Sequence, residues 1–241
     1  MFFEQKEAFG RYLSRFYGGI QATTPQLERY VRRGVEKSIA YAPSRMIDAA
    51  EEMFLKYLRA DIKRGPTEPY QLPMMLVAMG RDVTPTGRDF TRQIADPAPF
   101  VFPDDPQERV FHVQTIASDI RAQIAIFAAE ESTARSIAAQ FLLFVDAFEN
   151  RRFYADYEKW GFHSKWPCVI ESPEVFAPTI QTEANNLTIL AIDLTLKCTI
   201  PLYTAPGEFD ENDGKGIPGD KYDPSGFPVV QVVDSDGKAV K

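Results

Sequence analysis

The feature that most constrains the fold is a long alternation of apolar and polar residues between Leu187 and Leu202. Because successive side chains of a strand point to opposite faces, this pattern predicts one long strand with a buried and a solvated face. The predicted buried set is Leu190, Ile192, Leu194, Leu196 and Cys198, and the opposite set is Ile189, Ala191, Asp193, Thr195 and Lys197.

A similar period of two begins after Arg109. It predicts two adjacent strands, Val110 to Ile116 and Ile120 to Ala128, joined by a turn at Ala117-Ser118-Asp119. A helix capped by Ser132 is expected next, with Arg135, Gln140 and Glu149 on its outer face. Its predicted apolar stripe is Ile137, Phe141, Leu142, Val145 and Phe148. The aromatic-rich stretch Phe153 to Trp160 is interpreted as a loop, and Pro167–Glu171 and Val175–Thr182 as further strands.

The first part of the chain has the three-to-four spacing of amphipathic helices. Phe9, Leu13 and Phe16 form one face of a helix that Gly18-Gly19 ends. Thr23 to Gln26 has the residues of a helix start, so a second helix is predicted from about Pro25 to Ala40. A third is predicted from about Arg45 to Lys63.

Proline separates this front from the rest of the chain. Eight of the eighteen prolines lie between Pro66 and Pro106, where extended loop is expected, apart from Leu72–Met79 and Phe100–Phe102. The predicted class is therefore α+β: a helical amino-terminal region, a mixed or antiparallel sheet flanked by a helix, and an extended carboxyl-terminal arm. The expected segments are a helical region 1–65, a connecting segment 66–108, a core domain 109–205 and an arm 206–241.

The arm from Pro206 to Lys241 holds six Gly, four Pro and eight acidic residues, too few apolar residues for a core of its own. It contains one strand-forming island, Phe227 to Val233, which either adds to the sheet edge of a neighbour or packs back on its own domain. The candidate contact residues of this island are Phe227, Val229, Val230, Val232 and Val233.

Charge divides unevenly along the chain. Residues 1–64 carry twelve Lys/Arg against eight Asp/Glu, a net of +4, and residues 65–241 carry a net of −11. Arg32 and Arg33 are candidate partner contacts in the predicted second helix. The acidic overall balance of −7 argues against general DNA binding, which depends on neutralising phosphates.

Motifs that carry catalysis or bind a cofactor or metal are not found. The two histidines, His112 in a predicted strand and His163 in a predicted loop, have no ligand or nucleophile at a meaningful spacing. The letters of a dinucleotide fingerprint occur at Gly214–Gly219, but no helix is predicted after them to receive a pyrophosphate. The sequence thus favours a protein that is not an enzyme and has no cofactor, although a carboxylate site assembled in space stays an alternative.

The chain has no apolar run of eighteen residues, so no membrane span is expected, and its amino terminus does not read as a secretory signal. Cys168 and Cys198 lie far apart without a paired spacing. We expect two reduced, buried thiols and a cytoplasmic origin.

From about Pro73 to Leu202, the order of elements resembles tail-terminator and neck proteins of tailed bacteriophages. The resemblance rests on the predicted strand Arg121–Ala128, the helix Ser132–Glu149 and the strand that includes Ile192–Leu196. It implies a small sheet flanked by helices, rings of six subunits, and a place in the virion between the head connector and the tail tube. The helical front and the acidic arm are additions to this pattern.

The implied function is geometric. The resemblance implies contacts with copies of the chain and with connector, tail-tube or sheath proteins, while DNA passes nearby without specific binding. Assembly in the host cytoplasm and no membrane contact are expected. Two other interpretations stay open: a phage baseplate component, and an intracellular adaptor that binds a partner through its helical front.

Overall fold

The computed structural model describes residues 3–42, 72–80, 84–86, 93–105, 109–172, 174–181 and 187–205. Its elements, in chain order, are α1 (Phe3–Gly18), α2 (Pro25–Arg32), α3 (Val35–Ser38), β1 (Ile39–Tyr41), β2 (Met74–Met79), β3 (Thr84–Pro85), β4 (Ile94–Phe100), β5 (Phe111–Ala128), α5 (Glu131–Asp146), the 3₁₀ helix η2 (Phe148–Arg151), β6 (Arg152–Lys159), β7 (Phe162–Ile170), β8 (Thr179–Ile180) and β9 (Thr188–Thr204). The predicted third helix and the predicted arm lie outside the described residues.

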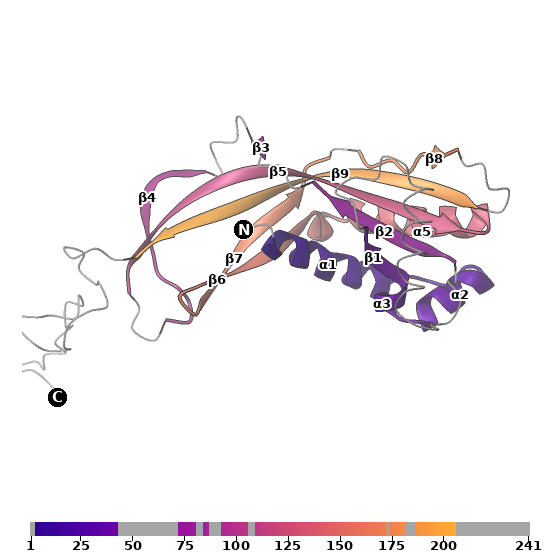
Figure 1. Cartoon of the computed structure of the whole chain (residues 1–241), viewed down its shortest axis with the longest axis horizontal. Helices are drawn as coiled ribbons and strands as arrows, with labels where there is room; N and C mark the ends of the chain where they lie inside the picture. Colours follow the sequence, from indigo (N-terminus) through magenta and orange to yellow (C-terminus); the bar gives the residue numbers. More distant parts are fainter. Residues whose placement is uncertain are drawn as a thin grey trace, which may run out of the picture.

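The strands form one curled mixed sheet in the order β1-β2-β5-β9-β7-β6, with the short strands β3 and β4 on β5 and β8 on β9. Only the β1–β2 pairing is parallel among those that the structure describes. β5 and β9 pair antiparallel from His112↔Thr204 to Ala128↔Thr188 and form a long curved ribbon along the described part of the molecule (Figure 1). The α+β class is confirmed.

The long strand and its predicted buried set are confirmed in β9. The predicted solvated face is only partly right: Asp193 is exposed, but Ile189 and Lys197 are buried. The turn expected at Ala117-Ser118-Asp119 is wrong, because β5 runs through these residues without interruption. Ala117 and Ser118 are buried and pair with Thr199 and Cys198 of β9. These small and polar residues therefore lie within a continuous strand and do not end it.

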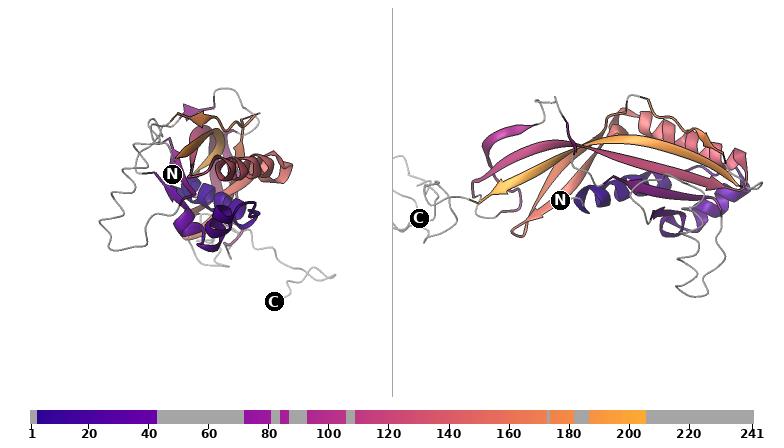
Figure 2. Two further views of the ribbon diagram at one scale, coloured as in Figure 1. Left: turned by 90° about the vertical axis from the view of Figure 1, so that its right-hand side faces the viewer. Right: turned by 45° about the horizontal axis from the view of Figure 1, so that its top comes forward.

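Helices α1 and α5 cover one face of the sheet. Phe9, Leu13 and Phe16 of α1 are buried, as their spacing predicts, and Phe16 meets Phe141 of α5 edge to face with ring centroids 5.0 Å apart. The end-on view of Figure 2 shows α5 beside α1 and α2. β2 lies within this core and is buried on both faces, which explains its continuous apolar sequence.

A polar seam fixes the α1–α2 connection on α5. The Gln140 side chain accepts from the backbone N–H of Gln21 at 2.7 Å and donates to its carbonyl at 2.9 Å. Thr24 caps α2 by accepting from the Leu27 N–H, and its hydroxyl also contacts that of Thr133 at 2.8 Å. These hydrogen bonds hold the α1–α2 connection against α5, in addition to the apolar contacts between the helices.

The predicted second helix is shorter than expected. α2 ends at Arg32, Gly34 has a φ of 89°, and the chain passes through the single turn α3 into strand β1. A left-handed residue ends an α-helix, so Gly34 carries the break that the spacing of apolar residues did not reveal. The cap of α5 also differs from the prediction, because Glu130 and not Ser132 occupies the N-cap.

The predicted loop Phe153–Trp160 is wrong: it forms β6 and the turn of a hairpin with β7. Phe153, Ala155 and Tyr157 are buried, while Tyr154 and Asp156 between them point outward. Buried and outward-facing residues therefore alternate along β6 as they do in a strand. Trp160 and Gly161 form the two-residue turn with φ values of 53° and 83°, as a type I′ hairpin requires.

At the end of the ribbon farthest from α5, the β6–β7 hairpin, β4 and the ends of β5 and β9 enclose an aromatic cluster. We call it the aromatic end; its members are Phe100, Phe102, Phe111, Trp160, Phe162, Trp166 and Tyr203. Arg109 lies 4.9 Å from the Phe162 ring centroid and donates to both carboxylate oxygens of the buried Asp105. Part of the extended loop that was expected between Pro66 and Pro106 is a strand, β4, and this strand contains Pro97 and Pro99.

Candidate interaction surface

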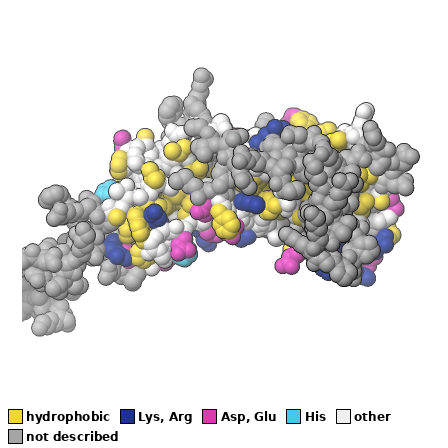
Figure 3. Space-filling model, in the orientation of Figure 1, with side chains coloured by type: hydrophobic (Ala, Val, Ile, Leu, Met, Phe, Trp, Pro, Cys, Tyr) yellow, Lys and Arg dark blue, Asp and Glu magenta, His cyan; other side chains and the backbone are white. Residues whose placement is uncertain are grey.

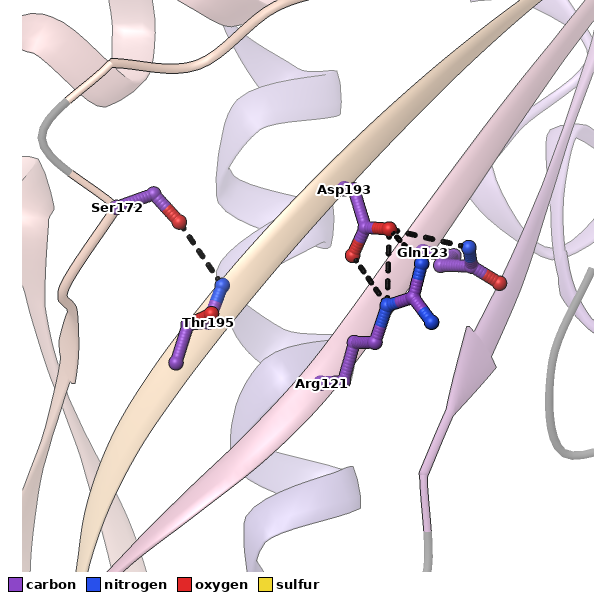
Figure 4. A network of polar contacts seen from close by, with 5 residues as sticks. All are labelled: Arg121, Gln123, Ser172, Asp193 and Thr195. Atoms are coloured by element: carbon purple, nitrogen blue, oxygen red, sulfur yellow. Dashed lines mark hydrogen bonds and ion pairs between the residues drawn. The ribbon is translucent and has the colours of Figure 1, made fainter. Parts of the chain in front are cut away.

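The outward face of the central ribbon carries a polar network (Figure 4). The Nε of Arg121 lies 2.9 Å from both carboxylate oxygens of Asp193, and the Gln123 amide donates to the same carboxylate at 3.2 Å. Beside it, the Thr195 N–H donates to the Ser172 hydroxyl at 2.9 Å. Asp193 thus has several donors around it, and its ion pair with Arg121 is about half exposed, so the network acts as a cross-strand clamp.

The same face continues with further paired polar groups. Lys197, although only 9% exposed, donates to Glu171 at 2.9 Å, and the Thr86 hydroxyl donates to Asp119 at 2.6 Å. These contacts join β5 and β9 to the segments that follow β3 and β7.

The histidines occupy structural positions. His112 lies in β5, as predicted, and pairs with Thr204 of β9, while His163 lies near the start of β7 and not in a loop. The backbone N–H of His163 donates to the Asp104 carboxylate, at 2.9 Å to the nearer oxygen. Among the residues that the structure describes, no group of three or more His, Cys, Asp or Glu side chains could hold a metal ion.

The two candidate arginines have different environments. Arg32 is 77% exposed and pairs with Glu28 one turn earlier on α2, at 2.5 Å. Arg33 turns inward: its Nε donates to the Ser38 hydroxyl at 2.9 Å and its guanidinium lies 5.1 Å from the Tyr30 ring centroid. Burial lowers the pKa of Arg33 below its usual value. The structure therefore leaves Arg32 on the surface but makes Arg33 part of the α2–α3 corner.

The other predicted contacts, Phe227, Val229, Val230, Val232 and Val233, lie outside the described residues. No helix within the described ranges is long and apolar enough to cross a membrane.

The most prominent apolar surface lies along the outer side of α5, and sequence reasoning missed it. Leu143 is 73% exposed and Phe176, in the segment before β8, is 66% exposed. Both line a hollow of about 720 Å³, and the charged residues Asp146, Arg151 and Glu174 line it as well. Its exposed and half-buried apolar lining is Ala139, Leu142, Leu143, Val175 and Phe176, which we call the α5 surface.

A second hollow of about 440 Å³ lies on the other side of Leu143, between α5 and the end of α1. Phe148 of η2, directly after the helix, is 91% exposed, although it was predicted to belong to the buried stripe. Leu143 thus stands between two hollows, which is the form of a surface that accepts side chains from another molecule. The signal in the sequence was the run Phe141-Leu142-Leu143-Phe144, which is too wide for a single buried stripe.

The face of the molecule in Figure 3 has a different character. Where the view draws described residues, acidic and basic side chains are interspersed with hydrophobic ones.

No family model matches the chain, and no curated protein matches it.

Proposed function

We propose that this chain is a virion structural protein, a ring-forming subunit of the head–tail connector or tail apparatus of a tailed phage, of the tail-terminator or neck type. The observation that carries the proposal is the α5 surface. Leu143 of α5 and Phe176 of the segment before β8 expose large apolar side chains next to each other. Contiguous exposed apolar groups around a hollow are typical of protein–protein contact sites.

The edges of the sheet favour contact through faces over contact through added strands. β4 carries Pro97 and Pro99, which cannot donate to a neighbouring strand. At β6, Arg11 lies over the edge, donates to the Tyr154 carbonyl at 3.5 Å and pairs with Asp156 at 2.6 Å. These two edges of the sheet are thus poorly suited to the addition of a further strand.

Ring formation requires that the α5 surface meet a different surface of the next copy. Such a heterologous contact closes into a ring when the rotation per subunit is right, whereas contact between two identical surfaces stops at a dimer. The elongated β5–β9 ribbon supplies a second, distant region for the contact, because it extends away from the helices toward the aromatic end (Figure 1).

The proposed partners are copies of this chain, in rings of six subunits as the resemblance implies, and neighbouring connector, tail-tube or sheath proteins. DNA would pass the ring without specific binding, in keeping with the net charge of −7. A filter-binding titration at low salt tests this part: weak binding without sequence preference is expected, and tight, salt-resistant binding contradicts it.

The test of the surface itself is a charge placed in its centre. Leu143→Asp should reduce self-association strongly while changing the free energy of unfolding by less than about 0.5 kcal/mol, because the side chain is exposed in the single chain. Sedimentation velocity measures the first effect and urea unfolding the second. Phe3→Asp is the matched control, since Phe3 at the start of α1 is 67% exposed and lies outside both the α5 surface and the β5–β9 ribbon. Equal association of wild type and Leu143→Asp would contradict the proposal.

The adaptor interpretation depends on the helical front. The apolar stripe of α1 is buried against α5 and the sheet, so only its polar side remains for a partner. A chain that stays single but captures a partner through α1 would favour the adaptor. A baseplate position is distinguished from a neck position by labelling the protein in intact particles.

A further inference from the structure

Cys168 and Cys198, far apart in the sequence, are direct neighbours in the fold. They face each other in register where β7 joins β9, and both side chains are fully buried. Both are free thiols, as predicted, and a hydrogen bond joins them. Their spacing in the sequence did not predict this pairing, because strand β8 lies between them in the chain.

The geometry of the strand pair suits a covalent bond between them. The Glu171 N–H donates to the Thr195 carbonyl at 2.8 Å, which marks that pair as a hydrogen-bonded position of the β7–β9 ladder. Hydrogen-bonded and non-hydrogen-bonded pairs alternate, so Cys168 and Cys198, three pairs along, occupy a non-hydrogen-bonded position. Cα atoms at such positions are about 4.5 Å apart. Disulfides span Cα separations of about 4.4–6.8 Å.

We propose that Cys168 and Cys198 are a disulfide modification site that ties the β6–β7 hairpin to the β5–β9 ribbon. The oxidant is a low-molecular-weight disulfide such as oxidised glutathione. One cysteine thiolate attacks a sulfur of the oxidant, forms a mixed disulfide and releases one small thiol. The second cysteine thiolate then attacks the protein sulfur of the mixed disulfide, the Cys168–Cys198 bond forms, and the second small thiol leaves. The two cysteines together lose two electrons and two protons, which the two released thiols carry.

Access controls the reaction. The hydrogen bond from Cys168 and burial both raise the pKa of the Cys198 thiol, so the reactive thiolate is scarce while the strands are together. β7 pairs with β9 at three consecutive positions, Cys168 to Ile170, and the adjacent Glu171–Thr195 hydrogen bond extends this short ladder by one position. Local separation of this short junction exposes both thiols at once. The rate of oxidation therefore follows the opening of the hairpin.

The experiment uses the full chain, reduced and then incubated with oxidised glutathione in native buffer and in urea below the unfolding transition. Intact mass and a non-reducing peptide map should show one intramolecular Cys168–Cys198 link with the loss of two hydrogen atoms. Its rate should rise several-fold in the urea buffer. The oxidised chain should then unfold several degrees higher than the reduced chain, because the link restricts the unfolded state.

The Cys198→Ser variant is the control, because it retains one thiol and can form only a mixed disulfide. Two outcomes overturn the proposal: wild type that carries glutathione on both cysteines with no internal link, or links only between chains. Thiols that remain unreacted in urea, while the fully unfolded chain reacts, also overturn it. The result does not depend on whether the chain forms rings.

Discussion

Where α1 and α5 cover the sheet, apolar side chains of helix and strand interleave in one large core that includes Phe9, Phe16 and Phe141. At the aromatic end, no described helix reaches the sheet, and seven aromatic rings fill the space between β4, the ribbon and the β6–β7 hairpin. Phe102 and Phe111 are buried there, but Trp160 is 48% exposed. A few large rings thus replace a helical layer, because each ring buries a large apolar area.

The difference teaches how the two parts respond to damage. In the helical half, a side chain contacts several elements that are themselves held by other contacts, so a cavity there weakens the whole fold. At the aromatic end, the rings connect a hairpin and strand ends that lie beyond the helices. We therefore expect changes there to act more locally.

The largest effect should come from Phe141→Ala. Phe141 is fully buried between α1 and the sheet, and truncation removes its contact with Phe16 and leaves a cavity. The free energy of unfolding should fall by about 3–5 kcal/mol. Urea unfolding measures it, and a loss below about 1 kcal/mol would show that the helical layer is not a packed core.

Phe102→Ala should cause the second largest loss in the free energy of unfolding. It also tests whether the aromatic end responds to damage differently from the helical half. Phe102 is buried and its ring lies within 5.5 Å, centroid to centroid, of Phe162 on the hairpin and of Phe111 and Tyr203 on the ribbon. The expected loss is about 3 kcal/mol at most, with hydrogen exchange accelerated at the aromatic end. Equal acceleration throughout α5 would contradict the local response.

The third largest effect should be a loss in the free energy of unfolding at alkaline pH, caused by a buried tyrosine of the helical half. Burial raises the pKa of Tyr30, so the folded state disfavours its phenolate; this contribution to stability is complete below about pH 10 and is lost as the pH rises further. The slope is about 1.4 kcal/mol per pH unit for each such tyrosine.

Tyr30→Phe isolates that contribution, because the Tyr30 hydroxyl is buried without a hydrogen-bond partner among the described residues. The variant should fold normally at neutral pH and lose less stability than wild type in alkaline urea unfolding. If wild type and Tyr30→Phe lost stability equally as the pH rises, the Tyr30 phenol would ionise as readily in the folded chain as in the unfolded chain, which would contradict the prediction.

Arg121→Ala should have the smallest effect. The ion pair of Arg121 with Asp193 lies on the outward face and is about half exposed, so its removal should cost roughly 0.2–1 kcal/mol. Thermal unfolding at low and high salt measures it, since salt should reduce the difference from wild type. A loss as large as that of Phe102→Ala would make the polar network a third structural centre.

Sequence periodicity predicted the helical half better than the aromatic end. The stripes of α1 and α5 and the alternation of β9 are strong because one side of each element is apolar and the other polar. In β6, Tyr154 and Tyr157 stand on opposite faces, so composition alone suggested an aromatic loop while the positions obeyed a strand alternation. The hairpin turn at Trp160 and Gly161 was also not predicted. Its positive φ values identify it in the structure, but Trp-Gly is not one of the residue pairs that indicate such a turn in a sequence.

The candidate surfaces were harder to predict for a physical reason. Arg33 looked like a surface charge, but its partners Ser38 and Pro73 are brought to it only by the fold. Phe148 was predicted to belong to the buried stripe of the helix, but it lies beyond the end of α5, in η2, and is 91% exposed. The pairing of Cys168 with Cys198 depends on β7 being the neighbour of β9 in the sheet, and the pattern of residues along a strand does not show which strands are neighbours.

Native mass spectrometry of the purified chain, over a range of concentrations, tests the central claim most directly. The account predicts a closed species whose mass is a fixed multiple of 27.2 kDa and which the Leu143→Asp substitution converts to single chains. A wild-type mass of 27.2 kDa at every concentration would contradict it.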